Sequence, residues 1–246
     1  MQKRELLEVT QNIKLTDKVG AMVLKSDNKL DLKAGQFVNL KLDGLYLRRP
    51  ISVCDISDDK HSLTLVYKAV GRGTCKMLDI KPHTRIDALM GLGNGFDITT
   101  PSKAPLLIGG GIGLAPLYYL CKCLISQNKR PVVVLGFANA EERYYESEFK
   151  GLGVPVNVTT VDGSYGIKGF VTAAFDTLSF DYYYACGPEP MLKSVWQALR
   201  CDGQLSFERR MGCGFGACMG CSCKTITGSK RICVEGPVLK KGEVVF

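Results

Sequence analysis

The chain has 246 residues, a hydrophobic fraction of 46% and a net charge of +8 at neutral pH. This length allows two or three small domains, each with its own core. The basic residues are scattered rather than clustered, which disfavours a nucleic-acid-binding surface, and eleven cysteines without a secretory leader indicate a reducing, cytoplasmic compartment.

The stretch from Ala104 to Cys121 carries no charged residue. Its length is close to the roughly 18 residues at which a membrane-spanning helix becomes a candidate. Pro105 and the glycines at 109–113 interrupt its first half, however, so a strand, a loop and a helix fit better. We therefore predict no membrane segment.

Residues 1–98 are predicted to form a small antiparallel β-barrel. Segments at Lys18–Lys25, Gln36–Leu42 and Ser62–Val70 mix apolar and polar residues with partial alternation, and Gly or Asp residues separate them. A short helix is expected at Thr74–Leu78. Several strands at this spacing are typical of a barrel.

Two motifs in this region carry groups suited to a flavin nucleotide. In Arg49-Pro50-Ile51-Ser52, the guanidinium suits a diphosphate and the hydroxyl suits the edge of a flavin ring. Gly71-Arg72-Gly73-Thr74 opens the short helix, whose first N–H groups are placed to hold a phosphate. Either motif alone also occurs by chance, the second as a plain turn with an N-cap.

Between residues 99 and 203, strand and helix patterns alternate, which is typical of a parallel α/β sheet. The expected strands are Leu106–Ile108, Pro131–Leu135, Val156–Val161 and Tyr182–Ala185. The expected helices are Leu114–Ser126, Ala140–Phe149, Phe170–Phe175 and Glu189–Leu199.

The loop Gly109-Gly110-Gly111-Ile112-Gly113 stands between the first of these strands and its helix. A loop at this position binds the phosphates of a dinucleotide in Rossmann-type domains. It departs from the usual fingerprint, because Pro116 replaces the third glycine and no acidic residue ends the next strand. A close helix–sheet crossing would also use glycine here, so that explanation stays open.

A second loop, Cys186-Gly187-Pro188, follows the last strand of this sheet. Ligands of open parallel sheets lie beyond the carboxyl ends of the strands, so this loop is expected to face the same crevice as 109–113. Its small residues leave room for a flat ring, and Cys186 is the candidate catalytic residue. A plain strand-to-helix turn is the alternative.

Four cysteines organise the end of the chain. Cys213, Cys218, Cys221 and Cys233 have the spacing C-x4-C-x2-C…C, the plant-type arrangement for a [2Fe–2S] cluster. The intervening glycines let the backbone curl around inorganic sulfides. A structural zinc site is the alternative, although zinc ribbons usually carry two C-x2-C pairs. Cys223 is too close to Cys221 to ligate without strain and is predicted to be a spectator.

With these motifs in order, the chain resembles the ferredoxin–NADP⁺ reductase superfamily over residues 1–200. With the cysteine segment it is similar to the electron-transfer subunits of NAD⁺-dependent, type B dihydroorotate dehydrogenases. The resemblance implies an FAD-binding barrel at 1–98, an NAD-binding α/β domain at 99–203 and a [2Fe–2S] domain at 204–246. By the same resemblance, the FAD contacts would be Arg49, Pro50, Ile51, Ser52, Val66, Tyr67, Lys68, Gly73 and Thr74, and the NAD contacts Gly109, Gly110, Gly111, Gly113, Gly187 and Pro188.

The resemblance also implies a function. An iron–sulfur cluster moves one electron at a time and NAD⁺ accepts a hydride, so FAD is expected between them. Electrons from dihydroorotate would leave an FMN-containing catalytic partner, in a heterotetramer with two copies of each subunit, and reach NAD⁺ during pyrimidine biosynthesis. One alternative is a subunit of another complex, such as a sulfide dehydrogenase or an NADH-dependent ferredoxin:NADP⁺ oxidoreductase. A non-catalytic scaffold with structural zinc is another.

The segment after the second strand of the sheet bears on the choice of nucleotide. Glu141 and Glu142 would repel a 2′-phosphate beside the adenosine ribose, whereas Arg143 would attract one. Two carboxylates against one guanidinium, together with the resemblance, favour NAD over NADP.

Overall fold

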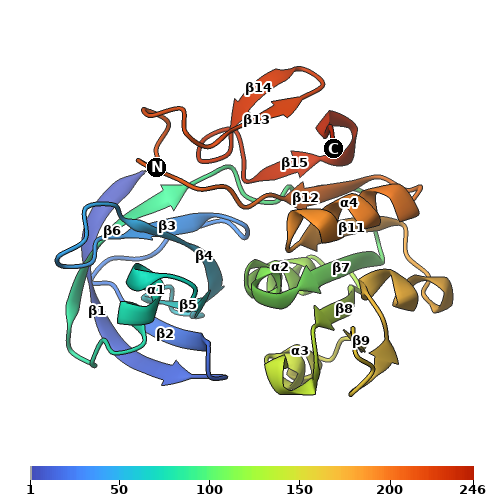
Figure 1. Cartoon of the computed structure of the whole chain (residues 1–246), viewed down its shortest axis with the longest axis horizontal. Helices are drawn as coiled ribbons and strands as arrows, with labels where there is room; N and C mark the ends of the chain where they lie inside the picture. Colours follow the sequence, from blue (N-terminus) through green and yellow to red (C-terminus); the bar gives the residue numbers. More distant parts are fainter. Residues whose placement is uncertain (1) are drawn as a thin grey trace.

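Six antiparallel strands close into a barrel in the computed structural model, which describes residues 2–246 (Figure 1). Around the barrel the order is β1-β2-β5-β4-β3-β6. The elements are β1 Lys3–Lys14, β2 Val19–Lys25, β3 Phe37–Leu40, β4 Arg49–Ile56, β5 Ser62–Lys68, α1 Arg72–Met77 and β6 Arg85–Leu92. The predicted barrel and its short helix are therefore confirmed.

Alternation of side chains along the strands builds the interior of the barrel. On β6, Ile86, Ala88 and Met90 are buried, and the residues between them face outward. They share a core with residues such as Leu7 of the neighbouring strand β1 and Met22 of β2. On β6 the core positions therefore recur at every second residue, whereas all four residues of β3 are buried.

The second sheet has seven strands in the order β10-β9-β8-β7-β11-β12-β15. Its strands are β7 Pro105–Gly110, β8 Val132–Phe137, β9 Val156–Thr160, β10 Ile167–Lys168, β11 Tyr182–Cys186, β12 Gly203–Ser206 and β15 Val238–Lys240. All neighbouring pairs are parallel except β12 with β15. The predicted parallel α/β sheet is thus confirmed, with an antiparallel strand added at one edge.

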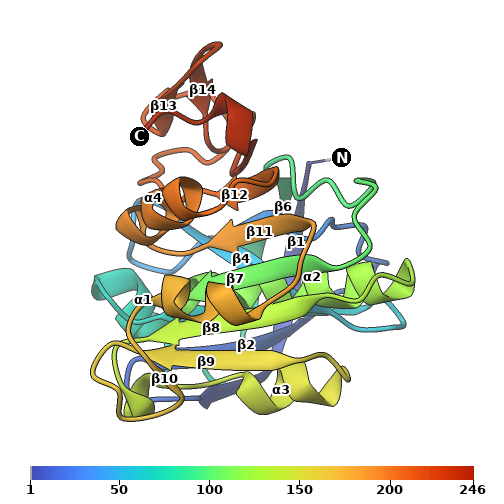
Figure 2. The same ribbon diagram turned by 90° about the vertical axis from the view of Figure 1, so that its right-hand side faces the viewer.

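Helices cover both faces of this sheet (Figures 1 and 2). The α-helices are α2 Leu114–Ser126, α3 Glu146–Gly151 and α4 Glu189–Ala198, and the 3₁₀ turns are η1 Gly111–Gly113, η2 Ala140–Glu142 and η3 Val171–Thr177. Helix α2 lies between the sheet and the barrel, whereas α4 and η3 cover the opposite face. No helix in the described part of the chain is long and apolar enough to cross a membrane.

The last segment forms the hairpin β13 Ser222–Thr225 and β14 Gly228–Arg231, and ends in η4 Lys241–Glu243. Between hairpin and end, β15 joins the edge of the nucleotide sheet by pairing with β12. The C-terminal segment therefore sits above that edge (Figure 2) and shares a sheet with the preceding domain. The domain boundary at 203/204 stays a prediction.

The helix predicted at Ala140–Phe149 is wrong in one respect, because it is broken. After η2, Tyr145 takes a left-handed conformation with φ of 63° before α3 begins. Its ring packs edge-on against Tyr118 of α2, and the Tyr144 hydroxyl donates to the Gly111 carbonyl at 2.9 Å. These tertiary contacts outweigh the local preference for one continuous helix.

The fold generates a prediction about the ion pairs of Asp87. Its carboxylate accepts from Arg48 and Arg4, whose side chains are 18% and 69% exposed. Arg48 also donates to the carbonyls of Asn39 and Asp87, at 3.2 and 3.0 Å. We expect Arg48→Met to lower the free energy of unfolding by about 2 kcal/mol and Arg4→Met by much less, measured by chemical denaturation.

The pH dependence of the free energy of unfolding provides a control for this prediction. Partial burial alone would raise the pKa of Asp87, but hydrogen bonds from Arg4 and Arg48 hold that pKa below its usual value. The stabilisation is therefore present at neutral pH and is lost as the pH falls through the lowered pKa. Equal effects of the two arginine variants at neutral pH would show that exposure does not decide the strength of these pairs.

Candidate flavin, nucleotide and cluster site

All three parts of the chain line one cavity of about 670 Å³. The barrel contributes Leu47–Ile51 and Thr74, and the nucleotide domain contributes Gly187–Glu189 and Leu192. The third side is Phe207–Met211, the segment that leads into the cysteines. We call this space the junction cavity. It brings the predicted flavin motif and one predicted nucleotide loop together beside the predicted cluster segment.

The two flavin motifs of the barrel are in direct contact. A Cβ atom added at Gly73 would lie 1.9 Å from Nε of Arg49, so the guanidinium lies against the Gly73 backbone. The Thr74 hydroxyl accepts from the N–H groups of Val70 and Gly71, at 3.0 and 3.2 Å, and fixes the turn. A guanidinium beside a glycine turn is a donor set that fits a diphosphate.

Residues of β4 and β5 differ in what they can offer a flavin. Pro50 is on the junction cavity, and its strand partner is Asn39 of β3. Val66 and Tyr67 are 2% and 1% exposed, and the Tyr67 hydroxyl donates to Oδ1 of Asn12 at 2.8 Å. Burial raises the pKa of Tyr67 to about 12. Contacts of these two residues with a cofactor would therefore use the backbone.

The glycine loop after β7 is tightly packed at three of its glycines and open at the fourth, Gly111. At three of the glycines an added Cβ atom would clash with a neighbour. It would lie 2.9 Å from the Cα of Leu114 if added to Gly109, and 2.3 Å from the Sδ of Met191 if added to Gly110. If added to Gly113, it would lie 2.2 Å from the carbonyl oxygen of Cys186. Only Gly111 has open space and a positive φ, of 52°. Three of the glycines therefore permit close crossings, whereas phosphate binding by the loop stays a prediction, for which Gly111 leaves space.

A second cavity, of about 450 Å³, opens where Gly111 meets the barrel. Its lining combines Lys68 of β5 with Asn139, Glu141 and Glu142 after β8, and the Lys68 ammonium lies 3.8 Å from Glu142. The Asn139 side chain accepts from both glutamate N–H groups at 3.1 Å. We call this space the carboxylate cavity. It places two acidic residues beside the glycine loop.

Arg143 is turned to other partners. Its Nη1 donates to Glu146 at 2.9 Å, and its guanidinium carbon lies 3.4 Å from the centre of the Tyr165 ring. Glu146 also accepts from Lys150 at 2.7 Å, so the guanidinium is part of a small charged network. Arg143 does not line the carboxylate cavity. The charge of Arg143 is therefore already paired with Glu146, which weakens the attraction that it would exert on a 2′-phosphate.

Cys186 ends β11 and is half-buried beneath the glycine loop. Burial raises the pKa of its thiol to about 12, although the Ser206 hydroxyl acts in the opposite direction. The thiol is therefore neutral at physiological pH, which disfavours a nucleophilic role. It does not line the junction cavity, whereas Gly187 and Pro188 do. Its assignment as a catalytic residue stays a prediction.

The four predicted cluster ligands are grouped two and two. The N–H of Cys218 donates to Sγ of Cys213 at 3.4 Å, and the N–H of Cys213 donates to Sγ of Cys218 at 3.5 Å. The second pair is Cys221 and Cys233, where the Cys233 N–H donates to Sγ of Cys221 at 3.4 Å. Two pairs of thiolates suit a cluster with two irons, whereas one zinc ion takes four thiolates at one point.

The donor chemistry around the Cys213 thiol suits an anionic sulfur site, whereas burial and the neighbouring Cys221 raise the pKa of Cys233 to about 12. Burial acts to raise the pKa of Cys213, but N–H groups of Phe215, Cys218 and Ala217 outweigh it and lower the pKa to about 6. Within residues 2–246, no three His, Cys, Asp or Glu side chains are gathered as a ready site for a single metal ion. Cys223 lies on β13 opposite Lys230, outside the two pairs.

Sequence reasoning missed three polar residues around the site. Asn39 donates to the Cys213 carbonyl at 3.0 Å, and Arg231 donates to the Gly216 carbonyl at 3.0 Å. Arg209, on the junction cavity, donates to Glu189 at 3.1 Å. Each joins segments far apart in the sequence, so no local pattern indicates it.

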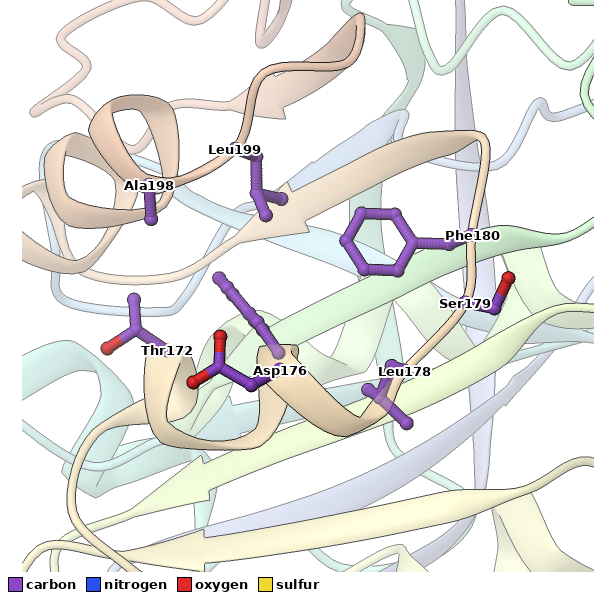
Figure 3. A pocket seen from close by; sticks show the side chains of 8 residues that line it. Thr172, Asp176, Leu178, Ser179, Phe180, Ala198 and Leu199 are labelled. Atoms are coloured by element: carbon purple, nitrogen blue, oxygen red, sulfur yellow. The ribbon is translucent and has the colours of Figure 1, made fainter.

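A further cavity, of about 450 Å³, lies on the other face of the nucleotide sheet (Figure 3). Thr172 and Asp176 of η3, Phe180 of the loop after it, and Leu199 after α4 surround it. None of the predicted flavin, nucleotide or cluster residues lines this cavity. It is separate from the site described above.

A closed barrel with a flavin motif, a parallel nucleotide sheet and a cysteine segment together define an NAD(P)-linked flavin reductase with an iron–sulfur domain. Residues 107–197 match the oxidoreductase NAD-binding domain, and residues 208–245 match the iron-sulfur cluster binding domain of dihydroorotate dehydrogenase B. The chain accordingly contains an NAD-binding domain and an iron–sulfur cluster binding domain.

Two curated relatives match over their full length. The chain is 40% identical to the dihydroorotate dehydrogenase B (NAD(+)) electron transfer subunit of Fusobacterium nucleatum, over 98% of each chain. It is 41% identical to the corresponding subunit of a Geobacillus strain, over 100% of each chain. The chain belongs to the family of electron transfer subunits of dihydroorotate dehydrogenase B (NAD(+)).

Solved structures agree on the fold. The chain matches the structure of an NADH-dependent reduced ferredoxin-NADP oxidoreductase with a TM-score of 0.87 and 30% identity, over 98% of this chain and 90% of that one. It also matches a ferredoxin NADP⁺ reductase from Neisseria gonorrhoeae with bound FAD and NADP, with a TM-score of 0.69 and 17% identity, over 80% and 90% of the two chains.

The thiol pairing generates a prediction about the cluster. We expect the protein to contain about two irons per chain. Changing Cys213, Cys218, Cys221 or Cys233 to Ser removes a thiolate and should abolish the visible absorption of the cluster. Cys223→Ser is the matched control and should retain it. Loss of the spectrum in Cys223→Ser with an intact spectrum in Cys221→Ser would overturn the ligand assignment.

Proposed function

We propose that this chain transfers electrons from a flavin-containing catalytic subunit, which oxidises dihydroorotate, to NAD⁺. The observation that carries this proposal is the junction cavity, where the barrel, the Gly187–Glu189 loop and the segment entering the cluster meet. When bound, FAD supplies exchange of single electrons with a cluster and of hydride with NAD. Residues proposed for FAD and for the nicotinamide line this cavity together with the segment that leads into the cysteines, which supports that use.

The residues of this chain would hold and orient these groups. Arg49 and the Gly73-Thr74 turn would bind the FAD diphosphate, with Pro50, Ile51 and Ser52 along the flavin. Val66, Tyr67 and Lys68 on β5 would add backbone contacts and one ammonium group. The NAD phosphates would lie at Gly111, with Gly187 and Pro188 leaving space for the nicotinamide.

The substrate site is assigned to a partner rather than to this chain. The barrel and the nucleotide sheet account for most of the length, and residues 204–246 are too few for a (β/α)₈ barrel of about 250 residues. Phe215 and Met219 on the cluster loop are 48% and 56% exposed, which suits docking to a partner. By family, we propose a heterotetramer with two copies of each subunit.

The same cofactors would also serve a different complex, and the likeness to an NADH-dependent reduced ferredoxin-NADP oxidoreductase favours this second candidate. That likeness is 30% in sequence, against about 40% for the relatives in dihydroorotate dehydrogenase B. The higher identity over the full length supports the first candidate.

The isolated chain should transfer electrons from NADH to an artificial dye but should not oxidise dihydroorotate. The reason is that hydride and flavin sites are present while the substrate site is assigned to the partner. Steady-state assays of the holoprotein, with and without the catalytic subunit, measure both activities. Appreciable NADH formation from dihydroorotate and NAD⁺ without a second polypeptide would overturn the assignment.

The carboxylate cavity generates a prediction about nucleotide choice. We expect a lower KM for NADH than for NADPH, because Glu141 and Glu142 repel a 2′-phosphate. Changing Glu141 to Gln should lower the ratio of the KM for NADPH to the KM for NADH about fivefold. The reason is that removing one negative charge near the 2′-phosphate is worth roughly 1 kcal/mol. Arg143→Gln is the control and should change the ratio less than about twofold, because Arg143 already pairs with Glu146. A lower KM for NADPH in the unchanged protein would contradict this prediction.

A further inference from the structure

Asn39 connects the flavin side of the barrel to the first cluster ligand. Its Nδ2 donates to the carbonyl oxygen of Cys213 at 3.0 Å, across a sequence separation of 174 residues. The side chain is only 1% exposed, so water does not compete for this bond. The buried Oδ1 atom of Asn39 has no hydrogen-bond partner among residues 2–246, so the bond from Nδ2 to Cys213 fixes the orientation of the side chain. A buried donor left without its acceptor costs more than an exposed one. The contact is therefore worth more than an ordinary surface hydrogen bond.

The strand register places Asn39 beside the flavin motif. On β3 it lies directly opposite Pro50 of β4, and side chains at directly opposed positions share a face of the sheet. Val38 and Leu40, its neighbours in sequence, point into the barrel core. The outer face of the barrel thus presents Pro50 to the junction cavity and Asn39 to the cluster loop.

The backbone of Asn39 is held firmly. Its carbonyl accepts from Nη1 of Arg48 at 3.2 Å, and the same guanidinium binds both carboxylate oxygens of Asp87 at 3.0 Å. Asp87 belongs to β6, the other strand neighbour of β3. Asn39 is therefore anchored to both adjacent strands rather than carried on a loop.

The cluster loop is shaped to receive this side chain. Gly214 has a φ of 79°, and a Cβ atom added there would lie 2.4 Å from Nδ2 of Asn39. A larger residue would push the loop away from the strand. Arg231 supports the loop from the opposite side through the Gly216 carbonyl at 3.0 Å. The Cys213–Gly216 turn is thus held between the barrel and the hairpin.

We propose that Asn39 is a positioning residue that fixes the distance between the flavin strand β4 and the Cys213 end of the cluster. The role in electron transfer rests on the proposed function, whereas the positioning itself rests on the Asn39–Cys213 hydrogen bond. Loss of the contact lets the loop move while the barrel, the thiols and the nucleotide site stay intact.

The test compares Asn39→Leu and Asn39→His in the holoprotein with FAD and cluster bound. Leucine is similar in size and has no donor, whereas histidine carries a nitrogen, Nδ1, as far from Cα as Nδ2 of asparagine. For Asn39→Leu we expect hydrogen exchange of residues 213–218 to rise about tenfold, the effect of one lost hydrogen bond. We also expect altered electron paramagnetic resonance of the reduced cluster, and slower cluster reduction by NADH at an unchanged rate of flavin reduction. Asn39→His should restore all three.

Two further variants keep the test decisive if Asn39→Leu folds poorly. Gly214→Ala leaves Asn39 in place but displaces the loop, so it should raise exchange in residues 213–218 in the same way. Asn12→Leu removes a barrel asparagine that bonds to the Met77 and Ile80 carbonyls and to the Tyr67 hydroxyl, none of which lies in the cluster loop, and should leave that exchange unchanged.

Unchanged exchange and an unchanged resonance spectrum in Asn39→Leu would overturn the proposal. Equal effects of Asn39→Leu, Asn39→His and Asn12→Leu would also overturn it, because they would show a general loss of barrel stability. If NADH reduces the flavin but never the cluster in the unchanged protein, the proposed function fails, while the exchange data still decide the role of Asn39.

Discussion

Packing of α2 between the barrel and the nucleotide sheet is the contact on which the rest of the structure depends. On one side its buried residues, such as Leu117 and Leu120, join a core that contains Cys54 and Val66 of the barrel. On the other side the same core includes Leu107 of β7. Each fully buried leucine contributes roughly 1.5–3 kcal/mol to stability, so this shared core holds the two domains in a fixed relative orientation. The ammonium of Lys122 adds a bond to Asp55 at 2.8 Å.

This packing decides where the functional loops meet. Helix α2 begins directly after the glycine loop and lies against β4, which carries Arg49–Ser52. One rigid element thus connects the nucleotide loop to the flavin motif. The junction cavity is the space left at the carboxyl end of the sheet by this arrangement, and its size follows from packing rather than from any single polar contact.

Local patterns allowed much of this to be predicted from the sequence. The cysteine spacing indicated the ligands because all but one lie within a single tight loop, and the glycine loop indicated a strand, a turn and a helix in that order. The break before α3 was missed because it depends on the packing of Tyr145 against Tyr118. These two residues are far apart in the sequence and become neighbours only in the folded chain. Asn39 gave no signal for the same reason, since one asparagine in a strand resembles any other polar residue.

The chain alone does not fix the separation of its two one-electron sites. Between β4 and Cys213 it passes through the whole nucleotide domain, so a small shift of that domain would move the cluster relative to the flavin. Non-covalent connections to both domains oppose such a shift. Strand β15 pairs with β12 and ties the C-terminal segment to the nucleotide sheet. On the barrel side, Asn94 after β6 donates to the Val238 carbonyl at 2.7 Å, and Asn39 ties the ligand loop to β3. Because these connections end on different domains, the cluster is fixed relative to both, and its place depends on their joint geometry rather than on any one of them.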